Sequence, residues 1–223
     1  MIVENPSPEF IQIIRLFKQH LEDIMASQGD ILINSKMTCE EENLDETRRG
    51  IAGCAKCELF QHRTNIVFGK GNEKAKLLII GEAPGHEEDI QGEPFVGRAG
   101  QLLTRMLKAI NIERAEVYIT NIVKCRPPNN RNPLPEEIKN CKPYLHKQLE
   151  IINPKIILTL GNFAAQALLN TTTGISKLRG KFYLYGQIKL LSIFHPAAIL
   201  RNPNLKKATW EDLKLLRDEY DQT

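Results

Sequence analysis

Short apolar segments alternate with segments of helical periodicity between residues 76 and 220. Lys76–Gly81 is an apolar run closed by glycine, and Lys155–Gly161 repeats this profile. Such runs are typical of strands that are buried on both faces of a parallel sheet. Two further strands are predicted over Val117–Thr120 and Ile188–Phe194.

Apolar residues with helical spacing fill the intervals between these strands. The predicted helices cover residues 102–110, 136–151, 162–169 and 209–220. Strands that alternate with helices predict an α/β fold of three layers, α/β/α, around a central, mostly parallel four-stranded sheet. In this architecture ligands bind beyond the carboxyl ends of the strands.

A separate helical pattern opens the chain. Ser7 suits the N-cap and Pro8 the first helical position, and apolar residues then recur with helical period up to about Ala26. Residues 27–46 are polar and have the character of a linker. The predicted organisation is therefore an N-terminal helix and polar linker over residues 1–47, followed by one globular domain over residues 48–223.

The chain has five cysteines, and four of them fall in the predicted domain. Cys54 and Cys57 form a close pair, while Cys125 and Cys141 flank a basic, proline-rich run. This spacing indicates four thiolates around one metal centre of zinc or iron–sulfur type; the alternative is unconnected cysteines buried as small hydrophobic residues. The fifth, Cys39, lies in the linker and is expected to be free. Cations nearby in sequence favour the thiolate form, namely Lys56, Lys124, Arg126, Lys139 and Lys142.

Composition places few limits on function. Hydrophobic residues make up 42% of the 223 residues and charged residues 26%, which is ordinary for a globular protein. The net charge is only +3, but residues 124–142 and 177–207 are locally basic, which suits a phosphate backbone or is ordinary solvated surface. A membrane span and a secretory signal are both missing from the pattern, so we expect a cytoplasmic protein without a membrane partner.

Two of the loops that follow predicted strands carry candidate chemistry near residue 90. The loop Gly81–Asp89 holds Glu82 at a tight turn and lacks the glycine spacing of a dinucleotide-binding loop. The loop Gly92–Gly100 holds Phe95, whose ring is suited to stacking on a planar base or else folds inward.

Two later loops add polar and basic groups. Asn121 offers an amide that can pair with the N3–H and O4 edge of uracil, although asparagine at a strand end also serves as a turn former. His195 closes the last predicted strand. Leu200 and Arg201 follow in an apolar-then-basic loop, where the leucine either wedges into a base stack or packs under the last helix.

Taken together, these motifs resemble the family 4 uracil-DNA glycosylases, the thermostable iron–sulfur type. The resemblance covers about residues 48–220, with the motifs and the four cysteines in the family's order. Any one motif alone is weak, but the combination is specific. The matching segments are Gly81-Glu82-Ala83-Pro84-Gly85, Pro94-Phe95-Val96-Gly97, Asn121-Ile122-Val123-Lys124-Cys125-Arg126-Pro127 and His195-Pro196-Ala197.

The resemblance implies roles for the pocket residues. Phe95 would stack on an extruded uracil, Asn121 would read its Watson–Crick edge and His195 would bond to O2. An enzyme that acts on a base must flip it from the stack into a pocket. A hydrogen bond to O2 strengthens as negative charge develops on the leaving uracil.

The first loop departs from related glycosylase families in one position. Those families place an aspartate or asparagine where this chain has Ala83, which cannot activate water. The backbone of Ala83 would still border the base. We assign water activation to Glu82, with Glu88 nearby as the alternative; either carboxylate could instead stabilise the sugar cation.

The resemblance also implies one [4Fe–4S] cluster, bound by Cys54, Cys57, Cys125 and Cys141. The leading hypothesis is a base-excision repair DNA glycosylase, monomeric, cytoplasmic and nucleoid-associated, that removes uracil from single- and double-stranded DNA. The alternatives are a non-catalytic iron–sulfur or zinc module that binds nucleic acid, and a redox protein. Neither alternative needs the set formed by Glu82, Phe95, Asn121 and His195.

Overall fold

The computed structural model describes Lys18 and residues 43–223. The predicted N-terminal helix, apart from Lys18, most of the linker and Cys39 lie outside the described residues. A compact unit begins at Glu42. Helix α2 (Leu44–Ile51) belongs to this unit and runs across the predicted boundary between residues 47 and 48.

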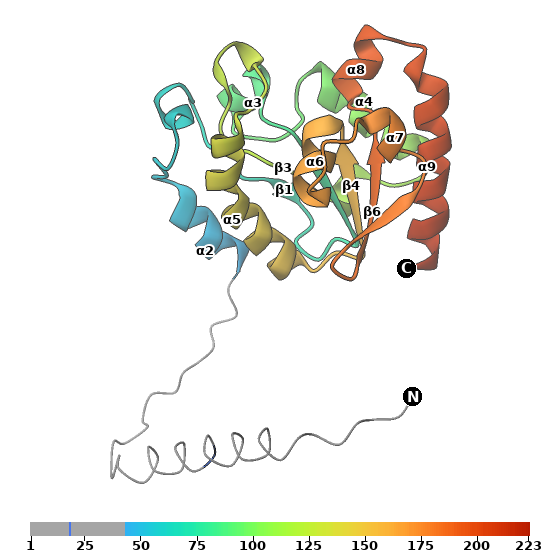
Figure 1. The fold of residues 1–223 in the computed structure, drawn as a ribbon, viewed down its shortest axis with the longest axis horizontal. Helices are drawn as coiled ribbons and strands as arrows, with labels where there is room; N and C mark the ends of the chain where they lie inside the picture. The colour runs from blue at the N-terminus through green and yellow to red at the C-terminus, as the bar shows by residue number, and fades with distance from the viewer. Residues whose placement is uncertain (1–17, 19–42) are drawn as a thin grey trace. The chain divides into compact units, whose positions relative to one another are not determined.

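A six-stranded sheet forms the centre of this unit, with the strand order β1-β3-β2-β4-β6-β5 (Figure 1). Neighbours among the four inner strands pair in parallel, and each strand matches a segment predicted from the sequence, with β3 ending one residue later than predicted. These strands are β3 (Tyr118–Asn121), β2 (Leu77–Gly81), β4 (Ile156–Leu160) and β6 (Ile188–Ile193). The prediction of a mostly parallel central sheet is confirmed.

Two short antiparallel strands extend the sheet from four strands to six. β1 (Lys70–Gly71) pairs with β3 at one edge, and β5 (Phe182–Tyr185) pairs with β6 at the other. Both residues of β1 are exposed, and β5 is at most half-buried. β1 is only two residues long, too short for the hydrophobic pattern to indicate it, whereas β5 carries the apolar and aromatic run Phe182–Tyr185, which the sequence interpretation overlooked.

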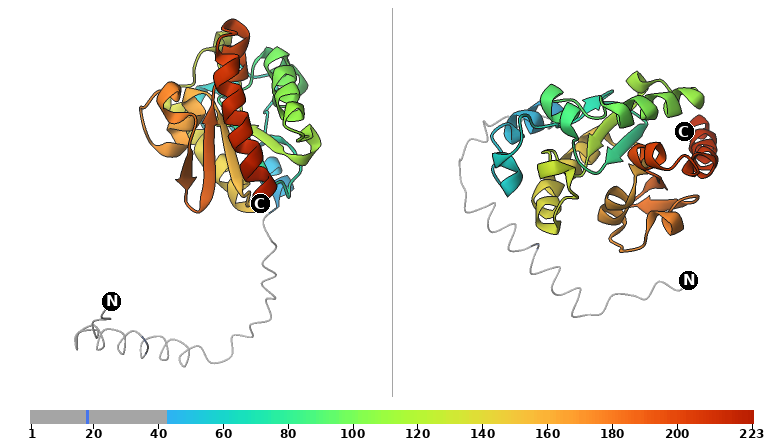
Figure 2. Two further views of the ribbon diagram at one scale, coloured as in Figure 1. Left: turned by 90° about the vertical axis from the view of Figure 1, so that its right-hand side faces the viewer. Right: turned by 90° about the horizontal axis from the view of Figure 1, so that it is seen from above.

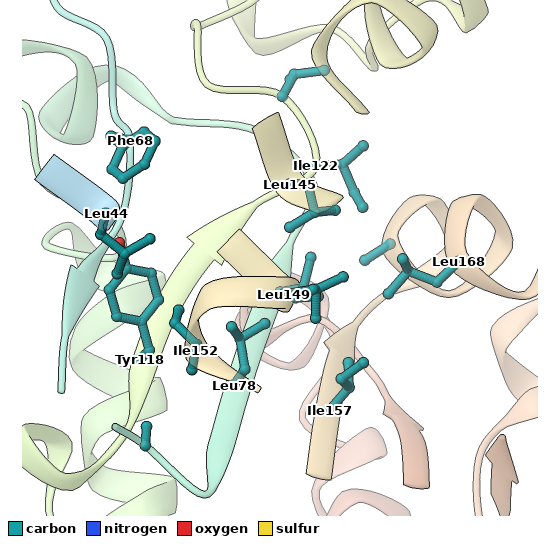
Figure 3. Close-up of a cluster of buried hydrophobic side chains, with 14 of the residues drawn as sticks. Leu44, Phe68, Leu78, Tyr118, Ile122, Leu145, Leu149, Ile152, Ile157 and Leu168 are labelled. Atoms are coloured by element: carbon teal, nitrogen blue, oxygen red, sulfur yellow. The ribbon is translucent and has the colours of Figure 1, made fainter. Parts of the chain in front are cut away.

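Helices cover both faces of the sheet, because alternate residues of each strand point to opposite sides. Leu78 and Ile80 of β2 pack with apolar residues of α2, α5 (Pro135–Ile152) and α6 (Asn162–Leu169), as Figure 3 shows in part. On the other face, Leu77 and Ile79 pack with residues of α4 (Arg98–Ala109), α8 (Pro196–Arg201) and α9 (Leu205–Gln222). The view from above in Figure 2 shows these layers. The three-layer prediction is confirmed.

Short elements complete the unit. They are the helices α3 (His86–Gln91) and α7 (Ile175–Leu178) and the 3-10 turns η1 (Glu58–Gln61), η2 (Arg114–Glu116) and η3 (Pro128–Asn130). Among the residues described, no helix combines the length and apolar character needed to cross a membrane.

The connections place an opening at the carboxyl ends of the strands. The chain leaves β2 towards α4 on one face of the sheet and leaves β4 towards α6 on the other face. Because β2 and β4 are neighbours, their following segments diverge and leave a crevice between them. Figure 1 shows α3, α6 and α8 at this same end of the sheet.

Candidate active site

A cavity of about 480 Å³ lies at this crevice. Its lining includes residues from all four loops predicted to carry chemistry. Leu200 is not part of this lining; it lies on α8 with 40% of its surface exposed. The predicted site residues that line the cavity are Glu82, Ala83, Glu88, Phe95, Asn121, His195 and Arg201.

Gly81, the last residue of β2, allows the aromatic and amide groups to converge. A Cβ atom at this position would lie 2.4 Å from Asn121 Oδ1 and 2.5 Å from Phe95 Cζ. Any side chain here would therefore push both groups away. The glycine at the strand end, which the sequence marked only as a turn signal, is needed for this close approach.

Phe95 is 7% exposed and sits between the pocket and the apolar layer below it. Its ring centroid lies 5.7 Å from that of His195, with the two planes tilted by 34°. Its backbone has a φ of 54°, a left-handed conformation that is uncommon for a bulky residue. The ring thus folds inward and still lines the cavity, and its stacking on a base stays a prediction.

Asn121 has an oxygen that the protein leaves without a partner. The residue is 1% exposed, and its Oδ1 is, within the described part of the chain, the one buried side-chain polar atom with no hydrogen bond. A buried acceptor without a donor costs about 1–3 kcal/mol. Asn121 lines the cavity, so a ligand whose N–H group reached this oxygen would remove that cost.

His195 is the N-cap of α8, and its Nδ1 accepts a hydrogen bond from the Ala197 amide at 3.1 Å. Burial of the ring, with a smaller contribution from the positive charge of Arg201, lowers the pKa of His195 to about 4. The ring is therefore neutral at pH 7. Since Nδ1 is an acceptor, the proton resides on Nε2, which is free to donate towards the cavity.

Glu82 follows β2 directly, and burial raises the pKa of its carboxyl group to about 7. The neighbouring segments are held in register by backbone bonds from Ile122 to Gly81 at 2.9 Å and from Val123 to Glu82 at 3.2 Å. A carboxylate with a pKa near 7 is matched to proton transfer at neutral pH. Glu82 thus has the properties of a general base.

Glu88, which the sequence offered as the alternative to Glu82 for water activation, is hydrogen-bonded to the loop that carries Phe95. Its Oε1 accepts hydrogen bonds from the Val96 amide at 3.0 Å and the Gly97 amide at 2.9 Å. On the other side of Phe95, Arg114 Nη2 donates to the Pro94 carbonyl at 2.7 Å. The loop that holds Phe95 in its left-handed conformation is therefore fixed by a charged group on each side.

The sequence interpretation overlooked the loop after β4. Gly161 has a φ of 87°, and a Cβ atom there would lie 3.0 Å from Cβ of His195. Gly161 and the following Asn162 and Phe163 line the cavity. The rule that placed candidate chemistry at strand ends applies to this loop as well, because it also follows a buried parallel strand.

Arg131 is a second lining residue that the motifs did not single out. Its guanidinium binds Glu137 with two hydrogen bonds, of 2.9 and 2.6 Å, and these bonds raise the pKa of Arg131. Glu137 also accepts the Leu134 amide at 2.7 Å at the start of α5. This arrangement fixes the loop between β3 and α5 against the helix.

The four described cysteines are free thiols from segments far apart in sequence. Cys54 and Cys57 lie between α2 and η1, Cys125 follows β3, and Cys141 lies on α5. The thiols influence one another electrostatically: Cys57 responds to Cys54, Cys125 to both of them, and Cys141 to Cys57 and Cys125. We refer to these four residues as the cysteine group.

The environment of the cysteine group corrects one expectation. Burial is the largest influence and raises the pKa of Cys57 and Cys125, and that of Cys141 to about 11. Of the five cations considered, Lys124 acts against this for Cys141, and its amide donates to Cys141 Sγ at 3.3 Å. Arg63, which was not considered, donates to Cys125 Sγ at 3.2 Å. Proximity in sequence did not identify which cations reach the sulfurs.

Comparison with known proteins gives the same assignment from several directions. A family model described as the uracil DNA glycosylase superfamily matches residues 68–214. The chain is 50% identical over 181 residues to the type-4 uracil-DNA glycosylase of Archaeoglobus fulgidus, covering 78% of this chain and 91% of that protein. For the type-4 enzymes of Sulfurisphaera tokodaii and Saccharolobus solfataricus, the identity is 47% over 186 residues, covering 79% of this chain and 84% and 86% of those proteins, respectively.

Proposed function

The chain belongs to the uracil DNA glycosylase superfamily and to its type-4 family, and we propose that it hydrolyses the N-glycosidic bond of uracil in single- and double-stranded DNA. The product is an abasic site, so the enzyme acts in base-excision repair. The observation that carries this proposal is the unpaired Oδ1 of Asn121, buried beside Phe95 in the cavity. Uracil has an N3–H donor for this oxygen, whereas cytosine has an acceptor at N3.

The remaining pocket groups support the same reaction. Phe95 provides an apolar ring for an extruded base. The neutral His195 donates from Nε2 to O2, where negative charge develops as the glycosidic bond breaks. Glu82, when ionised, accepts a proton from the attacking water or stabilises the positive charge on the sugar. Arg201, at the rim of the cavity, and Leu200 on the same helix contact the DNA strand.

The proposed cofactor is one [4Fe–4S] cluster held by the cysteine group. Support comes from the four mutually interacting thiols and from the two N–H donors to Cys125 and Cys141, since such donors are typical of cluster-bound sulfur. Within the described part of the chain, no three His, Cys, Asp or Glu side chains are arranged to hold one metal ion. A [4Fe–4S] cluster binds its four thiolates through four different irons, so the four sulfur atoms would lie farther apart than the ligands of a single metal ion. When bound, it supplies a rigid cross-link among the segments.

One assay tests the proposed activity. Purified protein is incubated with a uracil-containing oligonucleotide, and abasic sites are cleaved with alkali. We expect strand breaks at uracil in both single- and double-stranded substrates, and no breaks with an Asn121→Ala, His195→Ala double variant. A wild-type protein that is folded and iron-loaded yet yields no breaks would contradict the proposal. Visible absorbance that bleaches with dithionite tests the cluster, and a colourless zinc-containing protein would refute it.

We also propose that the enzyme works as a monomer on cytoplasmic, nucleoid DNA. This rests on the substrate, because one extruded base needs only one pocket, and the loops of one chain line such a pocket. Sedimentation of the protein alone and with an uncleavable uracil analogue in DNA tests the stoichiometry. A dimer that persists in both samples would refute the monomer.

A further inference from the structure

Lys124 is a lysine whose side chain is completely buried, with 0% of its surface exposed. It lies in the segment that connects Asn121 of the pocket to Cys125 of the cysteine group. A buried lysine is rare in proteins unless its charge has partners. Neither the proposed chemistry nor the proposed cluster binding gives this side chain a function.

The Lys124 side chain turns back towards the end of β3 and donates three hydrogen bonds. Its Nζ lies 2.6 Å from Thr120 Oγ1, 2.8 Å from the Asn121 carbonyl and 2.6 Å from Gln148 Oε1. Three acceptors match the three N–H groups of a lysine ammonium. Two of these acceptors are themselves fixed, because Thr120 Oγ1 and Gln148 Nε2 both donate to the Phe68 carbonyl at 2.8 Å.

The main chain of Lys124 is held by a second set of partners. Its amide donates to Cys141 Sγ at 3.3 Å, and its carbonyl accepts the Val67 amide at 2.8 Å. One residue is thus bound to the cysteine group through its backbone and to Asn121 through its side chain. The connection between pocket and cysteine group is short, because only three residues lie between Asn121 and Cys125.

We propose that Lys124 is a positioning residue for base recognition: it holds the Asn121 main chain so that the side-chain amide meets the base in the correct orientation. The inference rests on the proposed base-reading role of Asn121. The Asn121 side chain has no hydrogen bond at Oδ1 to orient it, so its direction depends on the backbone that carries it. The cysteine group would act on recognition through this same residue.

A double-mutant cycle tests the proposal. The variants are Lys124→Met, Asn121→Ala and the two combined. Each is measured for kcat/KM on uracil-containing DNA. Each is also measured for a Kd ratio, which is the Kd for DNA with an uncleavable 2′-fluorinated deoxyuridine divided by the Kd for the same DNA with thymine. Since a small misplacement of a binding group can cost about 100-fold, we expect Lys124→Met to lower kcat/KM by about 10- to 100-fold and to raise this Kd ratio by a similar factor. We expect the combined variant to be no worse than Asn121→Ala.

Controls separate positioning from general damage. Lys155→Met makes the same change at an exposed lysine just before β4, at the far end of the sheet, and should leave both values unchanged. Lys124→Met with Gln148→Met replaces Lys124 and one of its three hydrogen-bond partners by apolar groups, so part of the lost stability should return while the Asn121 carbonyl stays unheld. Iron content and the midpoint of thermal unfolding are measured for every variant.

Each possible failure has a different meaning. If Asn121→Ala keeps the wild-type values, the base-reading role itself is wrong, and the inference is lost with it. If Asn121→Ala is impaired but Lys124→Met is not, or if the two losses simply add, Lys124 does not act through Asn121. If Lys124→Met and the Lys124→Met, Gln148→Met double variant both lose their iron, Lys124 serves the cysteine group alone, and the positioning role is overturned.

Discussion

The cavity and the cysteine group lie at the two ends of residues 121–125, but the protein alone completes only one of them. In the cavity, His195 is already neutral, and Asn121 already presents a free acceptor. In the cysteine group, burial raises the pKa of Cys141 to about 11 and so favours the thiol, whereas a metal needs the thiolate. The pocket groups are placed by the fold alone, whereas the cysteine group would be completed only by the proposed cluster.

This difference has a physical basis in where each set of groups is attached. The pocket groups follow parallel strands, and backbone hydrogen bonds of the sheet hold the ends of these strands together. The cysteines come from a loop, the segment after β3, and a helix, and they share no such ladder. Mutations should therefore separate chemistry from assembly, and the following predictions test that separation.

The largest effect is expected for His195→Ala. Removing a donor to the developing negative charge typically costs about 100- to 1000-fold in kcat. Single-turnover excision of uracil measures this loss. Iron content and affinity for uracil-free DNA should stay at wild-type levels, and a loss of iron in this variant would break the distinction between pocket and cysteine group.

The pH profile should follow Glu82. Its pKa is about 7, so lowering the pH below 7 protonates the required carboxylate, and kcat/KM should fall about tenfold per pH unit. Above pH 7 Glu82 is ionised, so its titration should leave kcat/KM constant there. His195, with a pKa of about 4, should add no further change in kcat/KM between pH 5 and 7. Glu82→Gln should lower the rate and abolish the slope. A Gln variant that keeps the slope would assign it to another group.

Cys141→Ser should act on assembly. Loss of one ligand should remove iron and visible absorbance and lower the free energy of unfolding by about 4 kcal/mol, because bound metal contributes directly to folding. Denaturant unfolding and iron analysis measure these changes. The remaining iron-loaded molecules should excise uracil at nearly the wild-type kcat. A fully loaded, equally stable variant with no activity would place Cys141 in the chemistry.

The smallest effect is expected at Glu88. Glu88→Ala removes the acceptor for two loop amides next to Phe95 and should raise KM about tenfold, since a hydrogen bond to a charged group contributes about 1.5–3 kcal/mol. Glu88→Gln keeps an oxygen acceptor and should stay within a few-fold of wild type by the same reasoning. Steady-state kinetics on the two variants measures the difference. If Glu88→Gln is as impaired as Glu82→Gln, the carboxylate takes part in the reaction.

Local patterns were enough for the inner sheet and for most of the pocket. The runs Lys76–Gly81 and Lys155–Gly161 indicated β2 and β4 because a strand buried on both faces must be apolar throughout. The convergence of Asn121 and His195 followed from the rule that parallel strands end at one edge, whereas Phe95 reaches the cavity from the segment between α3 and α4. The edge strand β1 was not predicted because it is only two residues long, and β5 was overlooked although its four residues are all apolar or aromatic.

By itself, the amino-acid sequence determined the layers, the loops with candidate chemistry and the four cysteines, since these depend on residue type and short-range periodicity. Only the tertiary structure decided which groups reach each other. It turned Glu88 into a support for the Phe95 loop, brought Arg63 to Cys125 and folded Lys124 back onto Asn121. Hydrogen bonding, burial and pKa depend on neighbours that are distant in sequence, and no local pattern contains that information.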